Sequence, residues 1–198
     1  MFSGWIEPHA TLNNAHRWVF QELSGVRASV PLPVSEFHSD NGSEFMNRAT
    51  EAWCAREGVA FTRNRSRNKN DNCFVEQKNG AVVREYVGYD RLEGAEELAL
   101  LSEVYAHLAP LLNFFIPTRR LERKIRVGSR EVKVYDEPRT PFQRLMESAE
   151  VPPETKGALS ARIALYSPVE LQDNVNKAVM RLRRRLAQAN RKQTGARA

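Results

Sequence analysis

Two stretches of the chain decide its fold: FHSDNGSEF at residues 37–45 and NDNCFVEQKN at residues 70–79. The first carries Asp40, followed by the turn pair Asn41-Gly42, which tolerates a positive φ. The second carries Glu76. The spacing between two carboxylates is weak evidence alone, because a chain with 24 acidic residues contains many such pairs. The residues around Asp40 and Glu76 therefore carry the interpretation.

The residues around Asp40 predict a strand followed by a helix. Residues 33–38 favour a short strand, which places Asp40 at the carboxyl end of that strand. Ser43 has the character of a helix N-cap, and apolar residues at helical spacing continue to about Glu57. Gly58 then ends the helix as a C′ glycine.

The residues before Glu76 predict a strand, a loop and a second helix. Residues 59–62 (VAFT) favour a buried strand, and residues 64–71 form a polar, basic loop. The next helix begins at Asp71 or Asn72 and holds Glu76 in its first turns.

This order of a strand-end Asp, helix, strand, loop and helix-borne Glu resembles the catalytic half of the retroviral-integrase-like DDE transposases, which have a ribonuclease-H-like fold. The matching words are HSDNGSEF (38–45), FTR (61–63), ND (70–71), VEQKN (75–79) and VR (83–84). Farther on, NFF-x-P (113–117), YD (135–136) and TPFQRL (140–145) resemble the C-terminal part of bacterial insertion-sequence members. The resemblance covers about residues 3 to 148.

The resemblance implies a metal site. In DDE enzymes three carboxylates hold two divalent metals, which activate the attacking oxygen and stabilise the leaving oxygen at a DNA phosphodiester. Asp40 would be the second ligand and Glu76 the third, and Mg²⁺ or Mn²⁺ would be the cofactor.

The same stretch predicts contacts with DNA. Cations in the loop before Glu76 alternate with Asn and Ser and could bind phosphates. The resemblance implies that the helix residues after Glu76 face the DNA backbone. The predicted DNA-contacting residues are Arg63, Arg65, Arg67, Lys69, Lys78, Asn79 and Arg84.

The resemblance also implies a first catalytic Asp on a central first strand, and this chain has no Asp before Asp40. Glu7, Glu22 and Glu36 are the only acids there, and none has the right context. We therefore expect an α/β protein with an incomplete ribonuclease-H-like fold that lacks its central first strand. Metal binding should be weak, and strand transfer by this chain alone is not expected.

The missing strand has consequences for the sheet. We expect the strands before Asp40 and after Gly58 to pair in parallel. Residues 5–10 would be detached, mispaired or in the vacant place, because a removed central strand exposes the edges of both its neighbours.

Simpler interpretations stay open for each motif. Asp-Asn-Gly at residues 40–42 can be a turn with an Asx hydrogen bond. Glu76 can be a solvated glutamate favoured by the helix dipole. The basic loop and the helix face after Glu76 can be ordinary solvated surface.

Composition restricts the class of protein. The chain has 198 residues, 41% of them apolar and 27% charged, which is typical of a globular protein with a core and an appendage. No stretch of 18 apolar residues and no signal peptide is found, so we expect a cytoplasmic protein without a membrane partner. Cys54 and Cys73 are too few for a disulfide framework or a zinc site. The net charge of +6 favours a polyanionic partner.

The rest of the chain predicts mainly helices. Helices are expected over residues 13–23, 98–115 and 140–146, and from Ser167-Pro168 into the basic end of the chain. Ser24-Gly25 is expected to end the first of these helices. Residues 124–127 and 131–135 alternate charged and apolar residues around Gly128-Ser129, which predicts a β-hairpin. Pro152-Pro153 and Gly157 predict a linker.

These features predict three segments: residues 1–95 as a partial catalytic core, 96–150 as a helix and β-hairpin extension, and 151–198 as a linker and basic C-terminal helix. The leading functional interpretation is a fragment of a DDE transposase or integrase that acts in DNA integration and is inactive alone. The alternative is a non-enzymatic regulator, which binds DNA or forms oligomers with itself or with an intact transposase.

Overall fold

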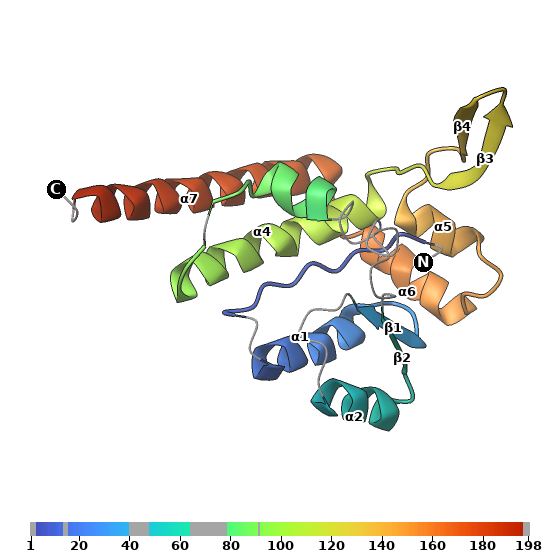
Figure 1. The fold of residues 1–198 in the computed structure, drawn as a ribbon, viewed down its shortest axis with the longest axis horizontal. Helices are drawn as coiled ribbons and strands as arrows, with labels where there is room; N and C mark the ends of the chain where they lie inside the picture. Colours follow the sequence, from blue (N-terminus) through green and yellow to red (C-terminus); the bar gives the residue numbers. More distant parts are fainter. Residues whose placement is uncertain (1–2, 14–15, 40–47, 64–78, 91, 196–198) are drawn as a thin grey trace. The chain divides into compact units, whose positions relative to one another are not determined.

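The computed structural model describes residues 3–13, 16–39, 48–63, 79–90 and 92–195. Over these residues the protein is a mixed α/β structure with two small sheets (Figure 1). It divides into two compact units, one made of residues 1–8 and 105–175, the other of residues 9–104 and 176–198. Each unit joins two separate stretches, so the units cut across the three segments expected from the sequence, whose boundaries stay a prediction.

The unit of residues 9–104 and 176–198 contains a parallel strand pair. Strand β1 (Glu36–Ser39) pairs in parallel with β2 (Ala60–Arg63), with Glu36 opposite Ala60 and Ser39 opposite Arg63. Helix α2 (Arg48–Glu57) lies between the two strands in the chain. The predicted parallel pairing is confirmed. Residues 3–12 form no strand.

A small core forms between α2 and the strand pair. Trp53, Cys54 and Val59 are buried, and Val34, Phe37 and Phe61 pack against them. The rings of Phe37 and Phe61 stack with centroids 5.8 Å apart. Burial raises the pKa of the Cys54 thiol, which is 1% exposed.

The expectation of a buried strand over residues 59–62 is wrong in part. Val59 is buried, but Ala60 is exposed, and Phe61 and Thr62 are half-buried. The physical reason is that the sheet of β1 and β2 has only two strands among the described residues, and its Phe37–Phe61 face is the one that packs on the core.

Gly58 ends α2 as predicted. Its φ is +67°, the left-handed region that glycine adopts without steric cost. The Val59 N–H donates to the Cys54 carbonyl at 2.8 Å, and the Gly58 N–H donates to the Ala55 carbonyl at 3.4 Å. This pair of bonds is a Schellman motif, and it turns the chain directly from α2 into β2.

Helix α1 (His16–Ser29) is longer than predicted. It continues through Ser24-Gly25, where the sequence was expected to end it, and the Val30 N–H still donates to the Val26 carbonyl at 2.9 Å. A glycine inside a helix costs only about 1 kcal/mol relative to alanine, so it does not have to stop a helix.

Two long helices follow the π-helical turn η2 (Asn79–Arg84): α4 (Ala95–Phe114) and α7 (Pro168–Gly195). Pro110 lies inside α4 without ending it. The apolar stripe predicted for the last helix is confirmed, because Leu171, Val175, Val179, Leu182 and Leu186 are all buried. No helix among the described residues is long and apolar enough to cross a membrane.

The unit of residues 1–8 and 105–175 is organised around the end of α4. Asn113 is 1% exposed, and its side-chain amide accepts the Ile6 N–H at 2.8 Å and donates to the Ile6 carbonyl at 2.7 Å. Next to it, the Phe114 ring meets Trp5 edge-on at 5.4 Å and lies 5.5 Å from Phe142. These contacts fix the segment around residues 5–6 against the helix.

The same unit carries the predicted β-hairpin, made of β3 (Leu121–Val127) and β4 (Arg130–Tyr135) in antiparallel register. Two short helices follow, α5 (Pro141–Glu147) and α6 (Pro153–Ile163) (Figure 1). The predicted linker is wrong, because residues 153–163 form α6. Proline is favoured in the first turn of a helix, so Pro152-Pro153 begins this helix rather than marking a linker.

Candidate functional site

Of the predicted site, the structure describes the carboxyl ends of β1 and β2. Because these strands are parallel and Ser39 lies opposite Arg63, both strands end at the same edge of the sheet. Asp40 follows Ser39, and the basic loop follows Arg63. Asp40, Arg65, Arg67, Lys69, Glu76 and Lys78 lie outside the described residues. Their roles stay predictions.

One face of the strand pair carries a row of hydrogen-bonded polar side chains. The Thr62 Oγ1 hydroxyl donates to Glu36 Oε1 at 2.5 Å, and His38 Nδ1 lies 2.8 Å from the same Thr62 oxygen. The row therefore links β1 to β2 across the pair. His38, a residue of β1, therefore has a protein partner.

Ser39 lies on the other face, at the end of β1. It is 5% exposed, and its hydroxyl has no hydrogen-bond partner among the described residues. A buried hydroxyl without a partner is costly, and such groups are uncommon in folded proteins. This feature comes directly before Asp40, the residue that the sequence marks most strongly.

Three predicted DNA-contacting residues are described. Arg63 is exposed at the end of β2. Asn79 begins η2 and Arg84 ends it, with the Arg84 guanidinium 5.4 Å from the centroid of the Tyr89 ring. Tyr89 is 83% exposed, so this cation–π contact lies at the surface. Short π-helical turns are rare in proteins overall, but those that occur are often at functional sites.

The three acids that precede Asp40 each have a neighbour of their own. Glu7 accepts the Trp5 Nε1–H at 2.8 Å, Glu22 lies 2.8 Å from His9 Nδ1, and Glu36 accepts the Thr62 hydroxyl. Within the described ranges no group of three or more His, Cys, Asp or Glu side chains could hold a metal ion.

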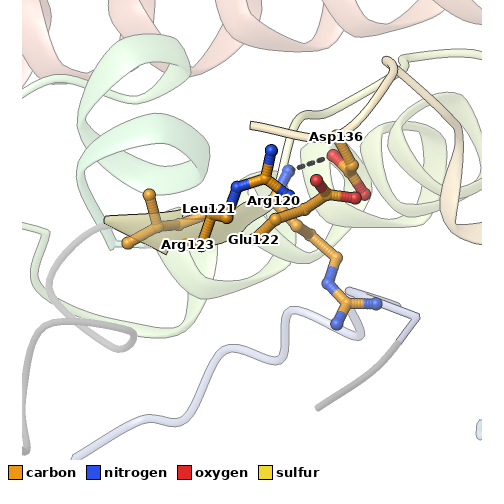
Figure 2. Close-up of a pocket in the computed structure, with 5 residues that line it drawn as sticks. All are labelled: Arg120, Leu121, Glu122, Arg123 and Asp136. Atoms are coloured by element: carbon orange, nitrogen blue, oxygen red, sulfur yellow. Dashed lines mark hydrogen bonds between the residues drawn. The ribbon is translucent and has the colours of Figure 1, made fainter. Parts of the chain in front are cut away.

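A basic surface that the sequence analysis did not single out lies on the β3–β4 hairpin. Every residue from Arg119 to Lys133 is exposed. Two open hollows lie along it, one of about 480 Å³ lined by Arg120, Leu121, Glu122, Arg123 and Asp136 (Figure 2) and one of about 200 Å³ lined by Lys124, Arg126, Ser129 and Glu131. The signal was present in the sequence as a hairpin pattern rich in Arg and Lys.

The base of the hairpin is held by Asp136 and Arg144. Asp136 accepts the Arg120 N–H at 2.6 Å (Figure 2) and the Arg144 Nη1–H at 2.5 Å, while Arg144 Nη2 donates to the Thr118 carbonyl at 2.8 Å. The Arg144 side chain is buried, and its hydrogen bond to Asp136, reinforced by the Arg120 N–H, lowers the pKa of the Asp136 carboxyl. The two strands therefore project from a fixed base.

The chain is similar to a curated bacterial protein. The chain is 40% identical over 142 residues to the uncharacterized protein y4rM of Sinorhizobium fredii (strain NBRC 101917 / NGR234), a match that covers 72% of this chain. The match spans 41% of the length of that relative. No family model matches the chain.

Proposed function

We propose that the chain is part of a DDE transposase or integrase acting in DNA integration, with Asp40 and Glu76 as two metal-ligating carboxylates of an incomplete ribonuclease-H-like domain. The observation that supports this proposal is the parallel pairing of β1 with β2. The resemblance implies that the strand ending before Asp40 is followed by a helix and then by a parallel neighbour, and α2 and β2 have that order.

The donor chemistry agrees with the proposal. Asp40 and Glu76 would supply carboxylate oxygens, the ligand type that Mg²⁺ and Mn²⁺ prefer. When bound, the metal would supply Lewis-acid stabilisation of charge on the phosphate oxygens. Arg63, Asn79 and Arg84, together with the loop cations, would hold the DNA backbone in place.

This chain would contribute two of the three carboxylates that such a site needs. Binding of a single metal ion would be weak, because two carboxylates leave most of the coordination shell to water. Strand transfer would need a third carboxylate from outside this sequence. We therefore propose that the chain is inactive alone.

Manganese titration followed by electron paramagnetic resonance tests this proposal. We expect weak Mn²⁺ binding that Asp40→Asn and Glu76→Gln each reduce at least tenfold, while the exposed α2 control Glu51→Gln leaves it unchanged. Binding that neither Asp40→Asn nor Glu76→Gln alters would contradict the metal site. Metal-dependent nicking of supercoiled plasmid that both variants abolish would contradict the claim of inactivity.

A second candidate is a non-enzymatic regulator that binds DNA or forms oligomers with an intact transposase. The specific observation is α7, whose apolar stripe is buried while its outer side carries exposed cations: Lys177, Arg181, Arg183, Arg184 and Arg191. Arg181 pairs with Glu103, so it is partly neutralised. Titration of DNA binding against salt tests this candidate, because phosphate contacts require affinity to fall steeply as salt rises.

A further inference from the structure

The β3–β4 hairpin exposes both of its faces. Isolated two-stranded hairpins are marginally stable in water, and here Ile125, Val127 and Val132 are all more than a third exposed. The hairpin nevertheless has a firm base. The Asp136 N–H donates to the Arg120 carbonyl at 2.9 Å, and Thr118 and Arg139 form an antiparallel bridge just outside the strands.

The register divides the hairpin into two faces. Lys124 lies opposite Lys133 and Arg126 lies opposite Glu131, so these four side chains share a face, named here the charged face. Ile125 lies opposite Val132 on the other face. The charged face thus has three cations and one carboxylate, all exposed.

The charged face has a hollow suited to an anion. The hollow of about 200 Å³ is lined by Lys124, Arg126, Ser129 and Glu131. Two cations and a hydroxyl are donors of the kind that bind phosphate oxygens in protein–DNA complexes. Glu131 opposes this, and it is paired with Lys124 at 3.0 Å.

We propose that the β3–β4 hairpin is a DNA-binding arm, whose charged face binds the phosphate backbone of duplex DNA. The choice of DNA as partner rests on the proposed function. A two-stranded ribbon fits the major groove of B-form DNA. Two residues of a strand span about 6.8 Å, and each DNA strand carries a charge about every 3.4 Å of helix axis. Lys124 and Arg126 can therefore each meet a different phosphate.

The arm is tested by removing its charges. The variant Lys124→Gln/Arg126→Gln/Lys133→Gln is compared with Lys177→Gln/Arg183→Gln/Arg184→Gln, which removes the same charge from exposed positions of α7. Affinity for a labelled duplex is measured by fluorescence anisotropy at several salt concentrations. We expect the hairpin variant to lose at least about tenfold in affinity and its salt slope to fall by about 2.7, because each phosphate contact contributes roughly 0.9. The α7 variant should lose less of both.

A second variant should change the affinity for DNA in the opposite direction. Glu131→Gln removes the carboxylate from the charged face and frees Lys124, so it should tighten DNA binding by about twofold to fivefold. All substituted side chains are exposed, and thermal unfolding should be close to that of the unchanged protein.

Three results would contradict the proposal that the hairpin is a DNA-binding arm. These are a hairpin variant with an unchanged salt slope, equal losses in the hairpin and α7 variants, or no tightening in Glu131→Gln. The experiment also distinguishes failure of the proposed function from failure of the proposed DNA-binding arm. A protein that does not bind DNA at all contradicts both proposals, whereas DNA binding that ignores the hairpin contradicts only the arm.

Discussion

The two strand pairs of this protein are built differently. The β1–β2 pair is parallel, has four residues in each strand, and packs one face on Trp53, Cys54 and Val59. The β3–β4 pair is antiparallel and longer, and no residue in either strand is buried. The first pair is thus stabilised by a core, and the second by its own ladder and by the contacts at its base.

This difference indicates that the β1–β2 pair contributes to the core, whereas the β3–β4 pair presents side chains at the surface. A parallel pair needs a crossover and a buried face, so residues at its ends can be positioned by packing. An exposed antiparallel ribbon contributes little to the core and leaves its side chains free to contact a partner. Substitutions in the two pairs should therefore have different effects.

The largest expected effect is on the core behind β1–β2. Trp53→Ala should lower the free energy of unfolding by about 3–5 kcal/mol, because Trp53 is 4% exposed and its removal leaves a cavity. Ile125→Ala on the exposed hairpin should change it by no more than about 0.5 kcal/mol. Urea denaturation followed by circular dichroism measures both. Similar losses in the two variants would contradict the comparison.

The glycine that joins α2 to β2 comes next. Gly58→Ala should cost about 1–2 kcal/mol, because alanine is strained at a φ of +67°. Gly157 lies inside α6, so Gly157→Ala should instead stabilise the protein by about 0.5–1 kcal/mol. The opposite signs can be read from urea midpoints. A destabilised Gly157→Ala would mean that α6 is not a regular helix there.

A smaller effect is expected at the base of the hairpin. Thr140 caps α5, its hydroxyl accepting the Gln143 N–H at 3.1 Å while the Gln143 side chain accepts the Thr140 N–H at 2.8 Å. Thr140→Ala should cost about 1 kcal/mol, whereas Thr140→Ser should keep the cap and cost less. Calorimetric unfolding of the two variants makes the test, and equal losses would argue against the capping box.

The smallest effect depends on pH. The Arg144 hydrogen bond and the Arg120 N–H lower the pKa of Asp136 in the folded protein. The stabilisation is therefore present above the ordinary aspartate pKa of about 3.9 and is lost as the pH falls through the lower folded value. Asp136→Asn should melt below the unchanged protein at neutral pH. This difference should shrink in acid, and a constant difference would contradict the assignment.

Much of the fold could be predicted from local signals. Alternation around Gly128-Ser129 predicts β3–β4, and Thr140-Pro141 predicts the start of α5, since each signal lies within a few residues. The parallel pairing of β1 with β2 is not local, and it was predicted from the resemblance rather than from periodicity.

The errors have physical causes. Gly25 and Pro153 were interpreted as breaks, but a glycine can be carried inside a helix and a proline can begin one. For the site, Arg63 ends β2, and Asn79 and Arg84 begin and end η2, while their contacts with DNA stay a prediction. The β3–β4 hairpin was predicted but its charged face was not, because the register of the two strands decides which side chains share a face. The amide bonds between Asn113 and Ile6 join residues 107 positions apart, and no pattern in the sequence predicts them.

The hydrogen bonds between Asn113 and Ile6 can form only late in synthesis of the chain. The segment of residues 3–8 leaves the ribosome before its partner on α4 exists, because the two are 107 residues apart. At translation rates of about 5–20 residues per second, Trp5 and Ile6 wait roughly 5–20 s for that partner. A nascent chain stalled before Asn113 should therefore keep this segment open to protease, and release of the stall should close it.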